Sequence, residues 1–266
     1  MTPLPAWATF ALANMTAHPG NLETLRKMED STINRGLRNG RFYLLAAGAS
    51  ILLVFSGFAR SYFLRSVFGF PALPGFLHLH GILMTLWFVL FFVQVLLISV
   101  HHTRLHRRLG LIGVGLAVLM IAVTAAVVIR AARRGFTAFP ETVKWPGFLL
   151  VSLGIVLTFS VLLFAAVWLR TRSPIHKRLM VLASLSIWGP AISRLPLHFI
   201  EAGSLWTSIA LGDTCVLICA AVDTVRNRRL HPAFLWGALL ILCSHPLLIW
   251  FGNTSLWARI ATRLLQ

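Results

Sequence analysis

The stretch that decides the fold is residues 109–129, LGLIGVGLAVLMIAVTAAVVI, which contains no charged side chain. A second stretch of the same kind follows at residues 148–169, FLLVSLGIVLTFSVLLFAAVWL. A helix of about 20 apolar residues is long enough to cross the apolar core of a bilayer. The strands of a closed barrel would alternate apolar and polar residues instead. Both stretches therefore predict transmembrane α-helices.

The composition of the whole chain agrees with this prediction. Its 266 residues are 58% hydrophobic and 12% charged, with a mean hydropathy of +0.81, whereas a soluble domain is roughly 45–50% apolar and about 25% charged. A chain this apolar has too little polar surface for water. We therefore predict an all-α fold, a polytopic membrane helix bundle, whose length leaves no room for a soluble catalytic domain.

Five further apolar segments bring the predicted number of transmembrane helices to seven. In chain order the seven ranges are Phe42–Phe58, Phe76–Val100, Leu109–Ile129, Phe148–Leu169, Leu179–Ser193, Leu205–Val222 and Ala233–Phe251. Residues 1–40 differ, because their second half is polar and basic with Leu22, Leu25 and Met28 at helical spacing. We expect residues 1–40 to form a cytoplasmic N-terminal arm with a short interfacial helix, and residues 41–266 to form a seven-helix transmembrane domain.

The basic residues predict the orientation of this domain. The net charge is +17, which alone would suggest nucleic acid, but Lys and Arg fall in the gaps between apolar runs. Fifteen of the 24 basic residues lie on the side of the N-terminus and nine on the other. Since cytoplasmic loops carry the excess of Lys and Arg, we predict the N-terminus inside and the C-terminus outside, in the inner (plasma) membrane. The expected partners are anionic lipid head groups and not nucleic acid.

Two similar motifs lie at the beginning of two predicted spans, each of which starts on the cytoplasmic side. His106-Arg107-Arg108-Leu109 recurs 70 residues later as His176-Lys177-Arg178-Leu179, and Arg228-Arg229-Leu230-His231-Pro232 has related contents. Basic side chains at helix N-termini add to the helix dipole and attract phosphate. These residues are candidate contacts for a lipid or quinone head group. The alternative is topogenic charge with snorkelling side chains.

A second set of polar residues lies toward the outer ends of the predicted spans. His80 and His245 are at similar depth on different helices, and neutral imidazole nitrogens at matched depth suit the two axial positions of a haem b. The same pair suits a transition metal, with His78 or His198 as a further ligand. The alternative is that these histidines bind interfacial water or backbone carbonyls.

Asp213 lies near the middle of a predicted span, where an unpaired charge is costly. Arg194, at the end of the preceding span, is the nearest obvious cation. We predict an ion pair between them. A proton relay or a contact with substrate is the alternative role for the same two residues.

Several motifs together resemble a known group of proteins. They are Arg41-Phe42-Tyr43, Gly57-Phe58-Ala59, His78-Leu79-His80-Gly81, His106-Arg107-Arg108-Leu109-Gly110, His176-Lys177-Arg178-Leu179-Met180, Arg194-Leu195-Pro196 and His231-Pro232. In this combination the chain resembles a group of uncharacterised, roughly seven-span bacterial inner-membrane proteins, over about residues 41–251. The resemblance implies a fold and a location but no activity. In architecture alone the chain is distantly similar to membrane b-type cytochromes, although no two helices each carry an inner and an outer histidine as a two-haem carrier would.

These observations lead to one expected function and two alternatives. The expectation is a redox-type membrane protein that binds one haem b or a metal through His80 and His245. The first alternative is a transporter or lipid-binding protein without a cofactor, and the second is a non-catalytic accessory subunit with a protein partner. The chain has no nucleotide-binding glycine loop and no H-E-x-x-H motif, which argues against a kinase or a metalloprotease of the soluble type.

Overall fold

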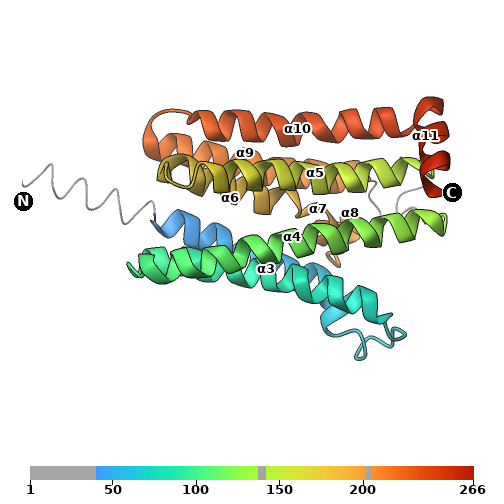
Figure 1. Ribbon diagram of the computed structural model, residues 1–266, viewed down its shortest axis with the longest axis horizontal. Coiled ribbons are helices and arrows are strands. Elements are labelled where there is room, and N and C mark those ends of the chain that lie inside the picture. Colours follow the sequence, from blue (N-terminus) through green and yellow to red (C-terminus); the bar gives the residue numbers. More distant parts are fainter. Residues whose placement is uncertain (1–39, 137–141, 202–204) are drawn as a thin grey trace, which may run out of the picture. The chain divides into compact units, whose positions relative to one another are not determined.

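The computed structural model describes residues 40–136, 142–201 and 205–266. Within these ranges all the regular elements are helices (Figure 1). The chain divides into two units, Met1–Tyr43 and Leu44–Gln266. Of the first unit only residues 40–43 are described, as the beginning of a helix. The predicted N-terminal arm at residues 1–40 therefore lies, apart from Gly40, outside the described residues.

Within the described ranges, six helices are long and apolar enough to cross a membrane. They are Gly40–Phe63, α3 (Gly75–Ser99), α4 (Thr103–Arg133), α5 (Gly147–Trp168), α9 (Leu205–Asn227) and α10 (Pro232–Gly252). The first of them ends in a π-helical turn, η1 (Ala59–Phe63). Each matches a predicted apolar segment, and together they confirm an all-helical, multi-pass membrane fold by length and composition.

The expected span at Leu179–Ser193 is shorter and interrupted. Its residues form α6 (Ser173–Ser186) and α7 (Gly189–Ile192), and α8 (His198–Glu201) follows. The break lies at residues 187–188, directly before Gly189 and Pro190 at the beginning of α7, because proline has no N–H to donate to the preceding turn. The segment begins earlier than predicted because Pro174 is well tolerated in the first turn of α6.

Most helix boundaries follow from proline and basic residues next to the apolar runs. Pro74 precedes α3 and Pro232 is the first residue of α10, where a missing N–H has no cost. With 31 residues, α4 is about 46 Å long, whereas the apolar core of a bilayer is about 30 Å thick. Its basic first and last turns, which lie beyond the predicted Leu109–Ile129, therefore extend out of the apolar layer.

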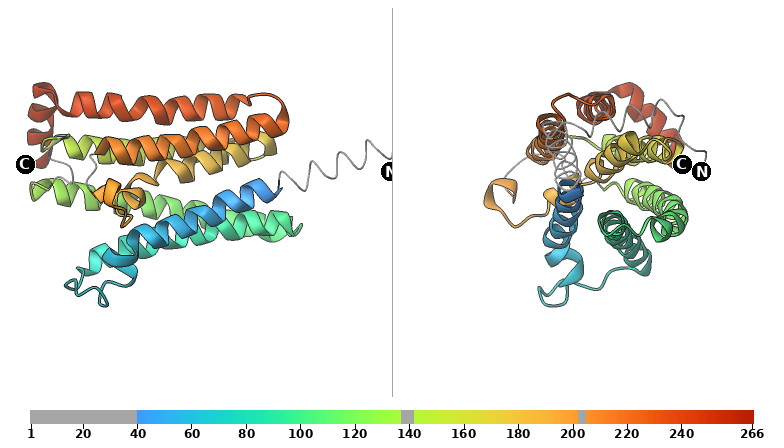
Figure 2. Two further views of the ribbon diagram at one scale, coloured as in Figure 1. Left: turned by 180° about the vertical axis from the view of Figure 1, so that it is seen from behind. Right: turned by 90° about the vertical axis from the view of Figure 1, so that its left-hand side faces the viewer.

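The core of the Leu44–Gln266 unit lies where α5, α6, α9 and α10 pack together, and α3 packs along α4 (Figures 1 and 2). Phe159 on α5 is fully buried and meets Trp87 of α3 edge-on, with the ring centroids 5.2 Å apart. Gly237 on α10 leaves room for Leu182 of α6, since a Cβ there would overlap that side chain. Large apolar side chains such as Leu111 and Phe164 remain exposed, as expected of a surface that faces lipid.

The last helix, α11 (Ser255–Leu265), lies across the end of the bundle instead of along it (Figures 1 and 2). Thr254 caps its N-terminus by accepting a hydrogen bond from Trp257 N–H. The indole N–H of Trp257 donates to the Pro146 carbonyl over 3.1 Å. Trp257 and Ala261 pack with Ala132 of α4 and Leu149 of α5. This helix therefore holds the ends of α4 and α5 together.

Candidate functional site

The outer histidines predicted to share a cofactor have separate partners. His80 on α3 has its Nδ1 3.3 Å from the Thr124 hydroxyl on α4. Both residues lie 22 positions from His102 at the α3–α4 connection, so the antiparallel helices bring them to the same depth. His78 is exposed, and its ring lies against Tyr62 with the centroids 5.8 Å apart.

His245 on α10 lies beside Asp213 on α9. Its Nδ1 is 3.0 Å from Asp213 Oδ1, and the two side chains are 16% and 19% exposed. This is the distance of an ion pair, but the two atoms are not aligned as a hydrogen bond. The residues lie 16 positions on either side of Arg229, within the α9–α10 connection. The same antiparallel rule therefore explains why they meet.

The predicted ion pair between Arg194 and Asp213 is not formed, because Arg194 has other contacts. Its Nη1 donates to the Pro190 carbonyl over 2.7 Å, and its guanidinium lies over the Phe58 ring at 5.0 Å. Arg194 follows the end of α7, one helical turn beyond Pro190, which directs its side chain back along that turn. His198 is the first residue of α8 and is exposed.

The described residues place no ready ligand set around the outer histidines. Within residues 40–136, 142–201 and 205–266, no three His, Cys, Asp or Glu side chains come together to hold a metal ion. The contacts of His80 with Thr124 and of His245 with Asp213 both use Nδ1. A ligating histidine commonly keeps such a partner on one ring nitrogen while the other binds the metal, so neither contact occupies the Nε2 that a haem iron would need.

The histidines of the two similar motifs meet at the other end of the bundle. His106 on α4 and His176 on α6 have their ring centroids 6.5 Å apart at 78°. The His176 Nδ1 is 2.8 Å from the Ala166 carbonyl, so Nδ1 carries the proton in this contact. The buried His106 Nδ1 and Gln94 Oε1 make no hydrogen bond with the described residues. The two histidines that occupy the same position in the similar motifs are therefore also neighbours in the structure.

A buried ion pair lies next to these histidines. Arg178 on α6 donates from Nε to Asp223 Oδ2 on α9 over 2.8 Å, and the two residues are 4% and 2% exposed. Arg178 Nη1 also donates to the Pro174 carbonyl over 2.7 Å. Asn227 Nδ2 donates to the Asp223 carbonyl over 2.7 Å. This network fixes the beginning of α6 against the end of α9.

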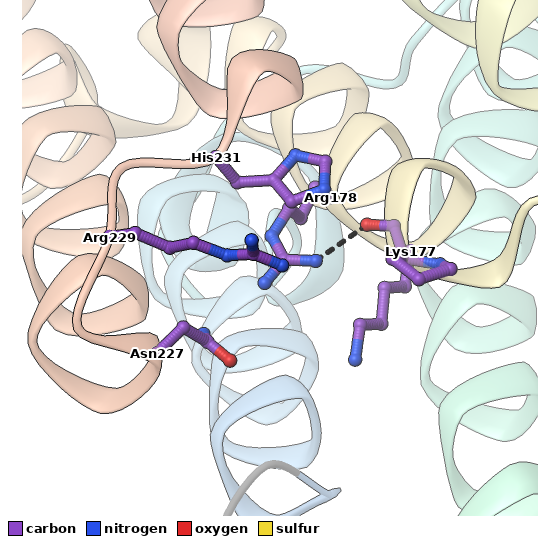
Figure 3. A pocket seen from close by; sticks show the side chains of 6 residues that line it. Lys177, Arg178, Asn227, Arg229 and His231 are labelled. Atoms are coloured by element: carbon purple, nitrogen blue, oxygen red, sulfur yellow. Dashed lines mark hydrogen bonds between the residues drawn. The ribbon is translucent and has the colours of Figure 1, made fainter.

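Arg178 of this ion pair lines a basic pocket, which Figure 3 shows from close by. Arg229 and His231 in the α9–α10 connection face Arg178 of α6 (Figure 3). The pocket has a volume of about 200 Å³. Its lining residues are Pro174, Lys177, Arg178, Asn227, Arg229 and His231. The neighbouring Asp223 carries a negative charge and Asn227 is neutral. Positively charged side chains therefore outnumber negatively charged ones at the pocket.

The surroundings of the pocket lower the pKa of two of its titratable groups, Lys177 and His231. Burial lowers the pKa of the Lys177 ammonium, and the charge of Arg178 lowers it further, while Asp223 acts in the opposite direction. Burial also lowers the pKa of His231, and Arg178 adds to this effect. The His231 Nδ1 accepts a hydrogen bond from Ala233 N–H over 3.1 Å as the N-cap of α10. Both pKa values are therefore lowered chiefly by burial, and the neighbouring positive charges add to the effect.

The pocket contains part of the predicted inner set and adds residues to it. Lys177 and Arg178 line it, His106 and His176 lie together outside its lining, and Arg107 and Arg108 are exposed on α4. Two residues were not identified from the sequence: Asn227, which lines the pocket, and Asp223, which pairs with Arg178. Asp223 carried a signal, since it is one of seven acidic residues in the chain and directly follows the apolar run Leu205–Val222.

Comparisons with known proteins add no assignment to this geometry. No family model, no curated protein and no solved structure matches this chain.

Proposed function

We propose that this chain is a seven-pass inner-membrane protein that binds the phosphate of an anionic lipid head group in the basic pocket. The observation that carries the proposal is the pocket itself, which Lys177, Arg178, Arg229 and His231 line at one end of the bundle. Its volume of about 200 Å³ is below the roughly 300–1,000 Å³ of sites for drug-sized ligands. A group the size of a phosphate suits it better.

The topology belongs to the same proposal. The α3–α4, α5–α6 and α9–α10 connections lie at one end of the bundle (Figure 1), and they carry the basic residues of the predicted cytoplasmic side. The interrupted segment from α6 to α8 serves as the seventh crossing, because it runs beside α5 toward the opposite end (Figure 1). The positive-inside rule then places the pocket in the cytoplasm.

The local electrostatics favour an anion. Lys177, Arg178 and Arg229 contribute three positive charges against the one negative charge of Asp223. The N-termini of α6 and α10 also begin at the pocket, at Ser173 and Pro232, and helix N-termini attract phosphate through their unpaired amides and dipoles. Phosphate oxygens accept charge-assisted hydrogen bonds from Arg and Lys.

A lipid is favoured over a soluble anion by the apolar surface beside the pocket. Leu230 in the α9–α10 connection and Trp236 near the beginning of α10 are exposed. Tryptophan is enriched at the depth of the head groups. A lipid bound here would place its phosphate in the pocket and its acyl chains along α10.

The test is thermal unfolding of the purified full-length protein with added phosphatidic acid, phosphatidylglycerol or phosphatidylcholine. The two anionic lipids should raise the midpoint and the zwitterionic lipid should not, because a ligand of the native state stabilises it. Arg229→Gln should weaken the apparent affinity about fivefold, from roughly 1 kcal/mol per basic residue. Arg170→Gln, an exposed residue at the same end and outside the pocket, is the matched control.

Two outcomes would change the proposal. Equal losses for Arg229→Gln and Arg170→Gln would show diffuse attraction to the membrane surface and would overturn the pocket as the site. An equal effect of inorganic phosphate alone would keep the anion site but remove the lipid from it. Because surface attraction is screened by salt, all titrations use one ionic strength.

The redox function remains the alternative proposal, with His80 and His245 as the residues that would hold a haem b or a metal. It rests on the similar depth of the two residues, and their contacts with Thr124 and Asp213 use Nδ1 and not Nε2. The described residues add no third His, Cys, Asp or Glu that would complete a group of three metal ligands. A reduced-minus-oxidised visible spectrum with metal analysis on the same purified sample tests it. A haem spectrum that is lost in both His80→Ala and His245→Ala would favour it over lipid binding.

A further inference from the structure

Asp213 and His245 form a pair of ionisable side chains inside the apolar layer, far from the basic pocket. Asp213 is eight residues from the beginning of α9 at Leu205, and His245 is seven residues from the end of α10 at Gly252. At about 1.5 Å per residue, both lie roughly 10–12 Å in from that end of their helices. Ionisable residues at such depth are rare and mark functional sites by default.

The charge balance of the pair depends on one proton. With one proton, an imidazolium faces a carboxylate or an imidazole faces a carboxylic acid, and the pair is neutral. With none or two, a net charge of minus or plus one remains in an apolar environment, which costs several kcal/mol. Asp213 Oδ1 and His245 Nδ1 are 3.0 Å apart, which is close enough for a single proton to balance the charge of both groups.

Among the described residues, Asp213 and His245 form an ion-pair contact only with each other. Of the helices packed against them, α11 carries Arg259 and Arg263 beside the end of α10. The surrounding helices contribute Cys215 and Cys219 on α9 and Cys243 on α10, all of them free thiols. Neither α5 nor α7 contains a titratable residue, and those of α6 lie in its first turns at the opposite end. Arg194, after α7, is directed to the Pro190 carbonyl and the Phe58 ring.

The pair also lies beside a proline in α10 and close to the short helix α7. Pro246 directly follows His245 inside α10, so the carbonyl one turn earlier lacks its helical N–H donor. On the other side, Gly212 of α9 packs close to Ile192 of α7, where an added Cβ would contact the Ile192 side chain at 3.6 Å. That contact places α7, the short helix that follows the break after α6, against α9 next to Asp213. Discontinuous helices at membrane depth form the ion sites of many secondary transporters.

We propose that Asp213 and His245 form an intramembrane proton-binding site, in which the two side chains hold one proton as a unit. The site is separate from the lipid pocket and does not depend on it. Its ligand is the proton, and its chemistry is reversible transfer of that proton between the carboxylate, the imidazole and water that reaches the partly exposed pair.

The experiment follows both members of the pair in the purified full-length protein at about pH 7. Infrared spectroscopy detects the protonated carboxyl group of Asp213, and ¹⁵N NMR detects the protonation state of His245. In His245→Asn, the proton should move to the carboxyl group, and its band should vanish in the Asp213→Asn/His245→Asn double variant. In Asp213→Asn, His245 should be neutral.

The opposite results would overturn the site. If Asp213 stays ionised in His245→Asn, or if His245 stays protonated in Asp213→Asn, then each charge is tolerated without the other and no proton is shared. Cys243→Ser, two residues before His245 and exposed, is the matched control and should leave both signals unchanged. If Asp213→Asn fails to fold, the His245→Asn spectrum alone decides, since it observes Asp213 directly.

Discussion

Arg178 and Asp223 lie 45 positions apart in the chain, yet their side chains form a buried ion pair with Nε and Oδ2 2.8 Å apart. The pair joins α6 to α9 at the end where the basic pocket opens. The pair therefore contributes both to the stability of the fold and to the shape of the pocket. Its contribution to stability can be measured without any ligand.

Breaking this pair from one side should strongly destabilise the protein. Arg178→Met removes the cation that donates to the buried Asp223 carboxylate, and loss of one partner of a buried ion pair costs about 3–5 kcal/mol. The double variant Arg178→Met/Asp223→Leu removes both charges and should recover most of that stability. Denaturant unfolding of the purified protein in detergent measures both variants. A double variant no more stable than Arg178→Met would contradict the ion-pair explanation.

A methyl group at Gly57 should be poorly tolerated. A Cβ at Gly57 would overlap the carbonyl group of Ala191 on α7, and backbone atoms cannot rotate away as a side chain can. Gly57→Ala should therefore cost about 1–3 kcal/mol. Gly115→Ala on α4, where no described atom lies within 4 Å of the added Cβ, should be neutral or stabilise by up to about 1 kcal/mol. Thermal unfolding of the two variants under one condition compares them, and equal effects would argue against the close approach.

The N-cap of α10 should make stability depend on pH. His231 accepts the Ala233 N–H through Nδ1, and its pKa in the folded protein is lowered from 6.5, chiefly by burial and also by Arg178. The folded state therefore binds fewer protons than the unfolded state just below pH 6.5. This contribution to stability is complete above about pH 6.5 and is lost as the pH falls through the lowered pKa.

Two substitutions separate this cap from other titrating groups. His231→Asn keeps an N-cap acceptor that does not titrate, so it should remove this part of the pH dependence while it preserves stability at neutral pH. His231→Ala should lose about 1 kcal/mol already at neutral pH. Unfolding midpoints measured across the pH range test both. The same slope in His231→Asn as in the parent protein would assign the effect to another group.

Trp257 should hold α11 to the rest of the bundle. Trp257→Phe removes the hydrogen bond to the Pro146 carbonyl and should cost about 1 kcal/mol, whereas Trp257→Ala also removes the ring from its contacts with α4 and α5 and should cost about 3–5 kcal/mol. Hydrogen exchange of the α11 amides measures the loss locally, because an undocked helix opens without global unfolding. Unchanged exchange in Trp257→Ala would show that α11 is held elsewhere.

Some of the residue pairs were accessible from the sequence through a simple rule. In an antiparallel helix pair, residues equally far from the connection lie at the same depth. His80 and Thr124 are equally spaced about His102, and Asp213 and His245 about Arg229. Asp213 was predicted to pair with Arg194, the obvious cation at the end of the preceding predicted span. Charge type suggested that partner, but helix geometry selected His245.

The interruption between α6 and α7 was only partly predictable. Gly189 and Pro190 mark a weak point in the sequence, yet Pro246 inside α10 leaves that helix continuous in the structure. The same residue type thus breaks one helix and is accommodated in another. The difference lies in the packing around each proline, which a pattern of apolar residues does not contain.

The sequence by itself determined that this protein is a bundle of apolar helices, where most of those helices begin and end, and that its basic residues gather in three of the connections. These features are local, because they depend on the length of an apolar run and on the prolines and charges at its ends. Only the tertiary structure decided which helices are neighbours, and hence that Arg178 meets Asp223 and Asp213 meets His245. The physical reason is that helix contacts in an apolar environment depend on the close fit of side chains, such as Leu182 against Gly237, and that fit involves residues far apart in the chain.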